Sequence, residues 1–225
     1  MIVKPKVRGF ICTTAHPVGC EAVVKSEIDY VKSKKAEDNG FKPKKVLVLG
    51  SSMGYGLASR ISLAFAGGAA TLGVMFDRPA SGNKTGTSGW YNTQAFEKYA
   101  KADGLYARTV NGDAYSDECK KEVIDIIKAD LGKVDCVVYS LAAPRRTVGD
   151  VTYSSVLKTT GEPYTNKTID LRNNTVSEVT IEPATEEEIA ATVKVMGGED
   201  WAAWIDALKA ADAIEDNAVT VAYSY

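Results

Sequence analysis

Three glycines, Gly50, Gly54 and Gly56, stand in a G-x-x-x-G-x-G pattern directly after the aliphatic run Val46 to Leu49. Glycine permits a tight turn at the end of a strand and lets the backbone approach a diphosphate closely. The segment Leu57 to Ala66 that follows is typical of a helix. Because a helix N-terminus offers free N–H groups and a positive dipole end to phosphate oxygens, the pattern predicts a dinucleotide site.

A carboxylate follows the next aliphatic run, where Asp77 comes directly after Thr71 to Phe76. At the end of a second parallel strand, such a carboxylate hydrogen-bonds the ribose hydroxyls of adenosine and repels a 2'-phosphate. Asp77 therefore favours NADH over NADPH, whereas the neighbouring Arg78 works against that preference.

Two more predicted strands end at the same edge of the sheet. Ligands of such sheets lie along the carboxyl ends of the strands, so the residues after these strands are candidates for the same site. The two strands are followed by Asn111 to Ala114 and by Ser140 to Ala143. Asp113 is suited to accept a hydrogen bond from the amino group of adenine. A Gly-Asp pair is equally typical of a simple chain turn, so these residues alone leave both roles open.

The alternation of short aliphatic runs with amphipathic segments indicates how these residues are positioned. Strands are predicted over Lys4 to Thr13, Val46 to Leu49, Thr71 to Phe76, Tyr106 to Val110, Val134 to Tyr139 and from Ala218 to Tyr225. Helices are predicted over Val18 to Lys35, Leu57 to Ala66, Ala95 to Ala102 and Asp117 to Leu131. The fold class is therefore α/β, a Rossmann-like doubly wound parallel sheet with helices on both faces.

Two stretches interrupt this alternation. Arg78 to Gly89 is rich in Gly, Ser, Thr and Lys and predicts a mobile surface loop. Residues 150 to 180 are rich in Thr, Tyr and Asn and predict a small irregular or β-hairpin insertion. The whole chain, 1–225, is interpreted as a single nucleotide-binding domain that carries this insertion.

Local signals define two helices after the insertion. Thr185 and Glu188 have the spacing of a capping box, and Gly197 with Gly198 would end the helix that it opens. In the next helix, Trp201 and Trp204 share a face with Ile205 and Leu208, which favours burial of the tryptophans over stacking on a ligand.

Composition excludes several classes of function. The 27 basic and 29 acidic residues give a formal charge of −2, so no basic field for nucleic acid or for an anionic membrane surface is expected. No apolar window is long enough for a membrane helix, and the N-terminal residues do not resemble a signal peptide. The expectation is a soluble, cytoplasmic protein.

The number of histidines and the spacing of the cysteines limit which metal sites are possible. His16 is the only histidine, so a multi-histidine zinc site is impossible and no metal is expected. Because Pro17 suits the first position of a helix, His16 is interpreted as a polar residue that precedes that helix. The four cysteines, Cys12, Cys20, Cys119 and Cys136, have no metal-binding spacing and are interpreted as reduced structural residues.

Several long motifs in this sequence resemble, in order, those of the trans-2-enoyl-CoA reductase family, which includes bacterial enoyl-ACP reductases distantly related to short-chain dehydrogenases. They are RGFICTTAHPVGCE, KKVLVLGSSMGYGLASRI, TLGVMFDRP, GTSGWYN, NGDAYSDE, VVYSLAAPRR, VMGGEDWAAWIDAL and AYSY. The resemblance covers essentially the whole chain.

The resemblance implies an NADH cofactor and a role for each matching residue. The diphosphate and its ribose would lie against Gly50, Ser51, Ser52, Met53, Gly54 and Tyr55. The adenosine end would contact Phe76 and Asp77, the adenine Asp113 and Ala114, and the neighbouring ribose Leu141 and Ala142. Tyr225 would contact the acyl substrate. Family members more often carry Glu where Asp77 stands.

The implied activity is the NADH-dependent reduction of the carbon-carbon double bond of an enoyl-CoA or enoyl-ACP thioester, in fatty acid synthesis or butyryl-CoA formation. The family's catalytic tyrosine and lysine, in a Tyr-x8-Lys pattern, match nothing up to Tyr225. They are expected in a remaining C-terminal part of the same polypeptide, so residues 1–225 alone are expected to be inactive.

Two other functions compete with this interpretation. One is a ketoreductase of the short-chain dehydrogenase type, whose Tyr-x-x-x-Lys pattern is imitated by Tyr30 and Lys34. That pair precedes the glycine turn here, whereas in ordinary short-chain dehydrogenases it follows the turn. The other is a non-catalytic NAD(H)-binding module.

Overall fold

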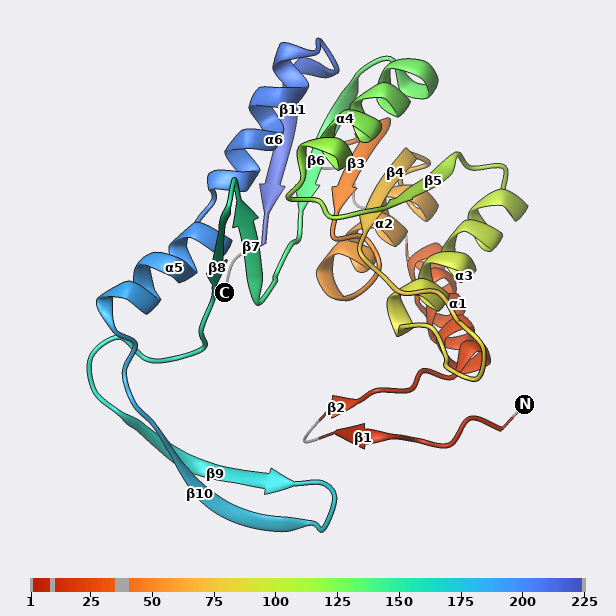
Figure 1. Cartoon of the computed structure of the whole chain (residues 1–225). Coiled ribbons are helices and arrows are strands. Elements are labelled where there is room, and N and C mark those ends of the chain that lie inside the picture. The colour runs from red at the N-terminus through yellow and green to blue at the C-terminus, as the bar shows by residue number, and fades with distance from the viewer. Residues whose placement is uncertain (1, 9–10, 35–40, 224–225) are drawn as a thin grey trace. The chain divides into compact units, whose positions relative to one another are not determined.

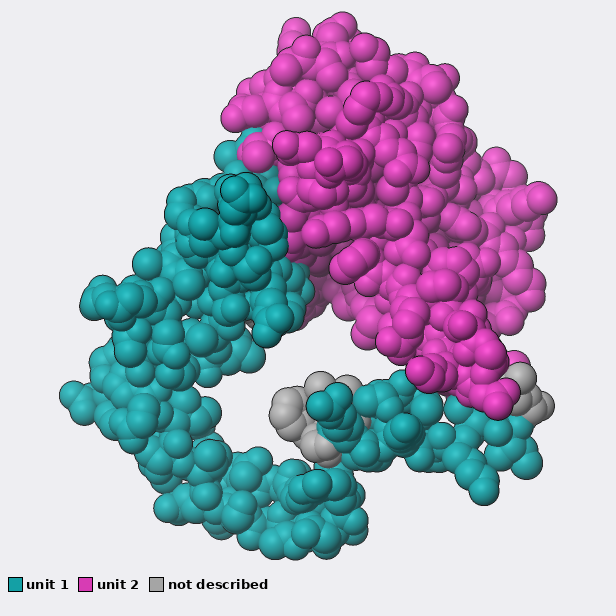
Figure 2. Space-filling view, in the orientation of Figure 1, with its two compact units in different colours: residues 1–14, 142–202 teal, residues 15–141, 203–225 magenta. Residues whose placement is uncertain are grey.

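The computed structural model describes residues 2–8, 11–34 and 41–223. Contacts between residues divide the chain into two compact units, one comprising Met1–Thr14 and Ala142–Ala202 and the other Ala15–Leu141 and Ala203–Tyr225 (Figure 2). The sequence predicts one domain over 1–225, and this stays a prediction.

A five-stranded parallel sheet forms the centre of the larger unit (Figure 1). Its strands are β3 (Lys45–Leu49), β4 (Ala70–Met75), β5 (Ala107–Asn111), β6 (Val134–Tyr139) and β11 (Ile214–Ala222). They lie in the order β11-β6-β3-β4-β5, so the chain moves one way from β3 to β5 and then returns to the other side of β3. Ligands of such sheets bind where the direction reverses, which is between β3 and β6.

Helices cover both faces of this sheet (Figure 1). One side carries α1 (Pro17–Ser33), α2 (Gly54–Phe65) and α3 (Ser88–Ala102). The other carries α4 (Asp117–Ile126), the π-helical turn η1 (Ile127–Leu131) and the C-terminal part of α6 (Glu199–Ala210). The predicted fold class, a doubly wound α/β sheet with a small β insertion, is confirmed.

Apolar side chains at helical spacing hold the first group of helices together. Val24 of α1, Ile61 of α2 and Phe96 of α3 are almost completely buried in one cluster. Burying a side chain of this size contributes about 1.5–3 kcal/mol. Within the sheet, Val46, Val48 and Val138 are buried under Leu63, so α2 is packed directly over the strands whose ends form the candidate site.

The smaller unit contains three antiparallel pairs of strands and α5 (Glu186–Met196). The pairs are β1 (Val7–Arg8) with β2 (Ile11–Cys12), β7 (Arg145–Val148) with β8 (Val151–Ser154), and β9 (Tyr164–Asp170) with β10 (Thr175–Ile181). The predicted capping box is present at α5, because Thr185 Oγ1 accepts from Glu188 N and Glu188 Oε2 accepts from Thr185 N.

Several predicted boundaries are wrong. Helix α3 begins at Ser88, seven residues before the predicted start, so part of the predicted mobile loop is helical. The strand predicted over Lys4 to Thr13 is a pair of two-residue strands. The helix predicted to reach Leu131 is α-helical only to Ile126 and ends in a π turn. Among the described residues, no helix is long and apolar enough to cross a bilayer.

Candidate dinucleotide-binding site

The turn after β3 has no room for side chains at two of its glycines. Gly50 has φ +79°, and a Cβ there would collide with the carbonyl oxygen of Ser140. A Cβ on Gly56 would collide in turn with the carbonyl oxygen of Gly50. The backbones of β3, α2 and the end of β6 therefore approach one another as closely as glycine allows, as the spacing of the motif predicts.

Hydrogen bonds anchor this turn to the neighbouring strand β4. The backbone N–H groups of Gly50 and Ser51 donate to the carbonyl oxygen of Val74, at 3.0 and 2.9 Å. The Ser51 hydroxyl donates to the same oxygen at 3.1 Å and is completely buried. Ser51 therefore supports the turn from beneath, and its hydroxyl is directed into the protein.

The third glycine differs, because it faces open space. Gly54 has φ +54°, and a Cβ built on it would meet no atom within 4 Å. It begins α2, and the N-cap residue Met53 makes no side-chain hydrogen bond to the helix. Free N–H groups at a helix N-terminus, beside an open backbone surface, fit the diphosphate of a dinucleotide.

The carboxylate of Asp77 lies against the N-terminus of α3 and the glycine turn. Its Oδ1 accepts a hydrogen bond from Thr87 Oγ1 at 2.7 Å. Asp77 Oδ1 and Ser52 Oγ each lie 2.6 Å from the position that a Cβ on Gly89 would take. Gly89 thus leaves room for the carboxylate and the hydroxyl to share one small region.

Further bonds fix the backbone on both sides of this carboxylate. Asn111 Oδ1 accepts from Asp77 N at 2.9 Å, and Asn111 Nδ2 donates to Asp77 O at 2.8 Å. Asn92 Nδ2 on α3 donates to Ser52 O at 3.1 Å. The neighbouring Phe76 is 81% exposed, so its ring is available to an adenosine that lies at this edge.

The turn after β5 combines an exposed carboxylate with a buried backbone. Asp113 Oδ1 accepts from Tyr115 N at 2.9 Å, which is the local turn that a Gly-Asp pair favours. Ala114 is buried, whereas Asp113 is exposed. Gly112 N donates to Met75 O at 2.9 Å, so this turn lies beside the end of β4 and near Phe76.

The last strand end brings Leu141 to the glycine turn. Ser140 N donates to Leu49 O at 2.8 Å, and Leu141 Cδ2 lies 3.1 Å from the Cβ position of Gly50. Ala142 belongs to the smaller compact unit, so its placement beside the turn stays a prediction. Tyr225 lies outside the described residues.

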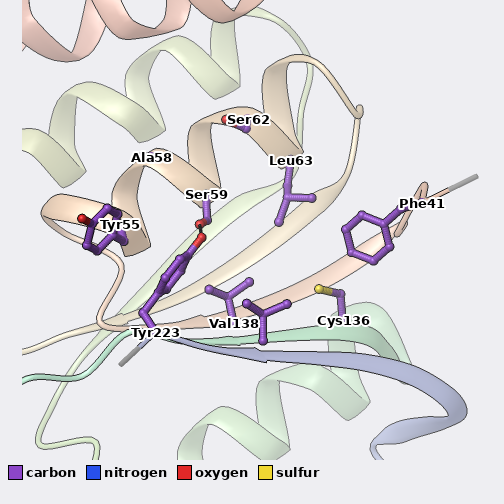
Figure 3. A pocket seen from close by; sticks show the side chains of 10 residues that line it. Phe41, Tyr55, Ala58, Ser59, Ser62, Leu63, Cys136, Val138 and Tyr223 are labelled. Carbon is purple, nitrogen blue, oxygen red and sulfur yellow. Dashed lines mark hydrogen bonds between the residues drawn. The ribbon is translucent and has the colours of Figure 1, made fainter. Parts of the chain in front are cut away.

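An aromatic pair connects the glycine turn to the end of β11 (Figure 3). The ring of Tyr55 is stacked on that of Tyr223, with centroids 5.1 Å apart and planes 19° from parallel. The hydroxyls of Tyr223 and Ser59 are 2.7 Å apart and hydrogen-bonded. Behind the pair, a cavity of about 330 Å³ is lined mainly by apolar side chains, including Leu63, Cys136 and Val138.

A buried arginine joins α2 to the strands β4 and β5. Arg60 Nη1 donates to Thr109 Oγ1 at 2.8 Å, and its Nη2 donates to Arg108 O at 2.8 Å. Its guanidinium lies 4.4 Å from the centre of the Phe96 ring. Complete burial lowers the pKa of Arg60 to about 10. Gly73 leaves room for the guanidinium, because a Cβ at this position would collide with it.

Two family models together cover most of the chain. Residues 2–82 match the NAD(P)H binding domain of trans-2-enoyl-CoA reductase, and residues 84–225 match the trans-2-enoyl-CoA reductase catalytic region. The chain belongs to the trans-2-enoyl-CoA reductase family.

Individual members of that family are similar along the whole chain. A trans-2-enoyl-CoA reductase [NADH] of Ruminiclostridium cellulolyticum is 60% identical over 228 residues, which cover 100% of this chain and 57% of the relative. An enoyl-[acyl-carrier-protein] reductase [NADH] of Opitutus terrae is 60% identical with the same coverage. The chain thus spans little more than half the length of these relatives.

Solved structures of family members have the same fold. The trans-2-enoyl-CoA reductase of Treponema denticola in complex with NAD matches with a TM-score of 0.94 and 50% identity, over 100% of this chain and 58% of that one. The Clostridium acetobutulicum enzyme in complex with NADH matches with a TM-score of 0.93 and 43% identity, over 100% and 56%.

Sequence reasoning missed several residues that shape the candidate site. Thr87, Gly89 and Asn92 contact Asp77 or the glycine turn, although the sequence predicts a mobile loop up to residue 89. Tyr223 was missed as the stacking partner of Tyr55. The motifs GTSGWYN and AYSY contain all of these residues and are the available signal, but their resemblance to a family does not show contacts.

Proposed function

We propose that this chain binds NADH and that the complete polypeptide reduces the carbon-carbon double bond of trans-2-enoyl-CoA or enoyl-ACP thioesters. The observation that carries the proposal is the open backbone at Gly54, which begins a helix without a side-chain cap. It lies in a chain whose relatives bear the names of NADH-dependent reductases of both thioester types.

The proposed binding residues follow the carboxyl edge of the sheet. Gly50, Ser51, Ser52, Met53, Gly54 and Tyr55 would hold the diphosphate and the ribose beside it. Phe76 and Asp77 would contact the adenosine end, and Asp113 with Ala114 the adenine. Leu141 and Ala142 would contact the neighbouring ribose. Hydrogen bonds that join each of the turns after β3, β4 and β5 to a neighbouring strand support this assignment.

Asp77 would set the preference for NADH. Its carboxylate is held by Thr87 and lies beside Ser52, in the position where ribose hydroxyls would donate to it. A 2'-phosphate at the same position would meet a negative charge at close range. The neighbouring Arg78 is exposed and offers a weaker, solvent-screened attraction.

The reacting end would lie near Tyr55 and Tyr223. Bound NADH supplies a hydride. The Tyr55–Tyr223 stack brings the end of β11 to the glycine turn. Tyr225 would contact the acyl thioester. The thioester oxygen gains negative charge during reduction, so a fixed hydroxyl donor there would accelerate the reaction. We assign that donor, with a lysine, to the Tyr-x8-Lys segment expected in the remaining C-terminal part.

Activity measurements test this proposal directly. The full-length polypeptide should oxidise NADH in the presence of crotonyl-CoA, whereas residues 1–225 should not, because the proton donor lies outside them. Acetoacetyl-CoA serves as the control substrate, since a ketoreductase would prefer its carbonyl group. Faster NADH oxidation with acetoacetyl-CoA, or equal turnover by the fragment, would show that the assignment is wrong.

The proposed location is the cytoplasm. In the part of the chain that the structure describes, no cysteine forms a disulfide, and Cys119 and Cys136 are buried. Free thiols are typical of reducing compartments. Fractionation of cells that express the untagged protein tests the location, and recovery from the periplasm or the membrane pellet would contradict it.

A further inference from the structure

Two buried side chains bind the same backbone oxygen in the turn after β5. Trp204 Nε1 on α6 donates to Ala114 O at 3.0 Å, and Lys120 Nζ on α4 donates to it at 3.2 Å. Lys120 Nζ also donates to Tyr115 O at 2.9 Å and lies 5.3 Å from the centre of the Trp204 ring. Two helices that are distant in sequence thus hold one short turn.

The peptide bond between Ala114 and Tyr115 links these donors to the exposed side of the turn. In a trans peptide the C=O and N–H groups point in opposite directions. The carbonyl of this peptide faces Trp204 and Lys120, and its N–H donates to Asp113 Oδ1 at 2.9 Å. The orientation of one peptide plane therefore fixes the position of the Asp113 carboxylate.

Packing alone does not account for this arrangement. Trp204 is completely buried and Lys120 is only 7% exposed. Burying an ammonium group is unfavourable unless its donors are bound, and an apolar side chain would cover the Trp204 ring without that cost. The ammonium is directed instead to two consecutive carbonyl oxygens of the turn, which indicates a need to hold these peptides in one orientation.

We propose that Trp204 and Lys120 are positioning residues for adenine recognition. They hold the Ala114–Tyr115 peptide, which holds the Asp113 carboxylate where it accepts a hydrogen bond from the exocyclic amino group of adenine. The inference rests on the proposed function, which puts adenine at Asp113 and Ala114. Neither side chain touches the adenine, so both act through the backbone and Asp113.

A comparison of two dinucleotides separates this role from a general structural one. In reduced nicotinamide hypoxanthine dinucleotide, a carbonyl oxygen replaces the exocyclic amino group of adenine, so the hydrogen bond from that group to Asp113 is lost and the carbonyl oxygen is repelled by the carboxylate. Affinities of the full-length polypeptide for this compound and for NADH are measured by calorimetry. The wild-type protein should bind NADH more tightly, and Trp204→Phe or Lys120→Met should reduce that preference about five-fold, the size expected for one hydrogen bond.

Matched controls lie beside each residue. Trp201 is on the same helix, and among the described residues its buried indole nitrogen has no hydrogen-bond partner. Lys121 is exposed and forms an ion pair with Asp125. Trp201→Phe and Lys121→Met should leave the preference for NADH unchanged. Circular dichroism of each variant confirms that the comparison is made between folded proteins.

The outcomes distinguish this inference from the function on which it rests. If the wild-type protein does not bind NADH, the proposed function is wrong. The positioning role is overturned if NADH binds but is not preferred over the hypoxanthine compound. It is also overturned if both folded variants, Trp204→Phe and Lys120→Met, lose affinity for the two dinucleotides equally. Lys120→Met keeps the test valid should Trp204→Phe fail to fold.

Discussion

Gly56 lies so close to the carbonyl oxygen of Gly50 that a Cβ does not fit between them. The first turn of α2 therefore rests directly on the end of β3. This contact brings the helix N-terminus, with its free N–H groups, to the carboxyl edge of the sheet. The position of the candidate phosphate site depends on it.

Gly56→Ala should therefore destabilise the fold. The added methyl group must displace backbone, which costs about 1–3 kcal/mol. Thermal unfolding should show a lower midpoint than the wild-type protein. Gly19→Ala is the matched control, because Gly19 is also in the first turn of a helix but a Cβ there makes only ordinary contacts, none closer than 3.6 Å. An equal loss of stability in both variants would show that the close contact is unimportant.

Gly54→Val should prevent NADH binding and leave the protein folded. The valine side chain would enter the open space in which the diphosphate is proposed to lie. A positive φ costs a non-glycine residue about 1–2 kcal/mol, so the comparison uses Gly104→Val, which carries a similar strain at φ +70° and also faces open space. Calorimetry should detect NADH binding to Gly104→Val only. Normal NADH binding by Gly54→Val would contradict the proposed diphosphate site at Gly54.

Asp77→Asn should shift the cofactor preference towards NADPH. The amide can still accept from Thr87 but carries no charge, so repulsion of a 2'-phosphate is lost. Two charges about 4 Å apart in water interact by about 1 kcal/mol, which predicts roughly a five-fold change in the ratio of NADPH to NADH affinity. Asp113→Asn should weaken the binding of NADH and of NADPH equally. A change of similar size in the ratio of NADPH to NADH affinity in Asp113→Asn would show that Asp77 has no specific role in cofactor preference.

The thiols should react with iodoacetamide in a defined order. The Thr14 hydroxyl, which can donate a hydrogen bond to the sulfur of the exposed Cys12, lowers the pKa of that thiol because it stabilises the thiolate. Burial raises the pKa of Cys136 to about 11. Mass spectrometry of the native protein at pH 8 should find Cys12 labelled first and Cys136 labelled only after unfolding.

Thr14→Val is the matching variant for this experiment. It removes the side-chain hydrogen bond that contributes most to the lowered pKa of Cys12, so labelling of Cys12 at pH 8 should become slower. Labelling of Cys136 should not change. Early modification of Cys136 in the wild-type protein would mean that the strand β6 is accessible in the native state.

Local signals in the sequence were sufficient to predict most of the sheet. Strands β3, β4 and β6 are mainly aliphatic, with polar exceptions that include Thr71 in β4 and Asp135 in β6, because these strands are buried on both faces. The helix after His16 begins as predicted, at Pro17, and His16 Nδ1 accepts from Gly19 N at 3.2 Å. These features depend on neighbours in the chain, so sequence spacing alone indicates them.

Long-range contacts were not predictable in the same way. The start of α3 at Ser88 depends on Asp77, Ser52 and Met53, which approach from elsewhere in the chain. The role of Lys120 depends on Trp204 and on the direction of a single carbonyl group. No pattern of hydrophobicity or spacing carries this information.

The pairing of β3 with β6 has a consequence for how the chain folds. Asp135, in β6, accepts hydrogen bonds from Lys44 N and Lys45 N, residues 91 and 90 positions away. The β9–β10 hairpin joins residues that are near neighbours, and such hairpins form within about 1–10 μs. The central pair must instead close a long loop before any of its contacts form, which slows folding. We therefore expect the candidate dinucleotide-binding site, at the ends of β3 and β6, to be assembled after the local hairpins and helices.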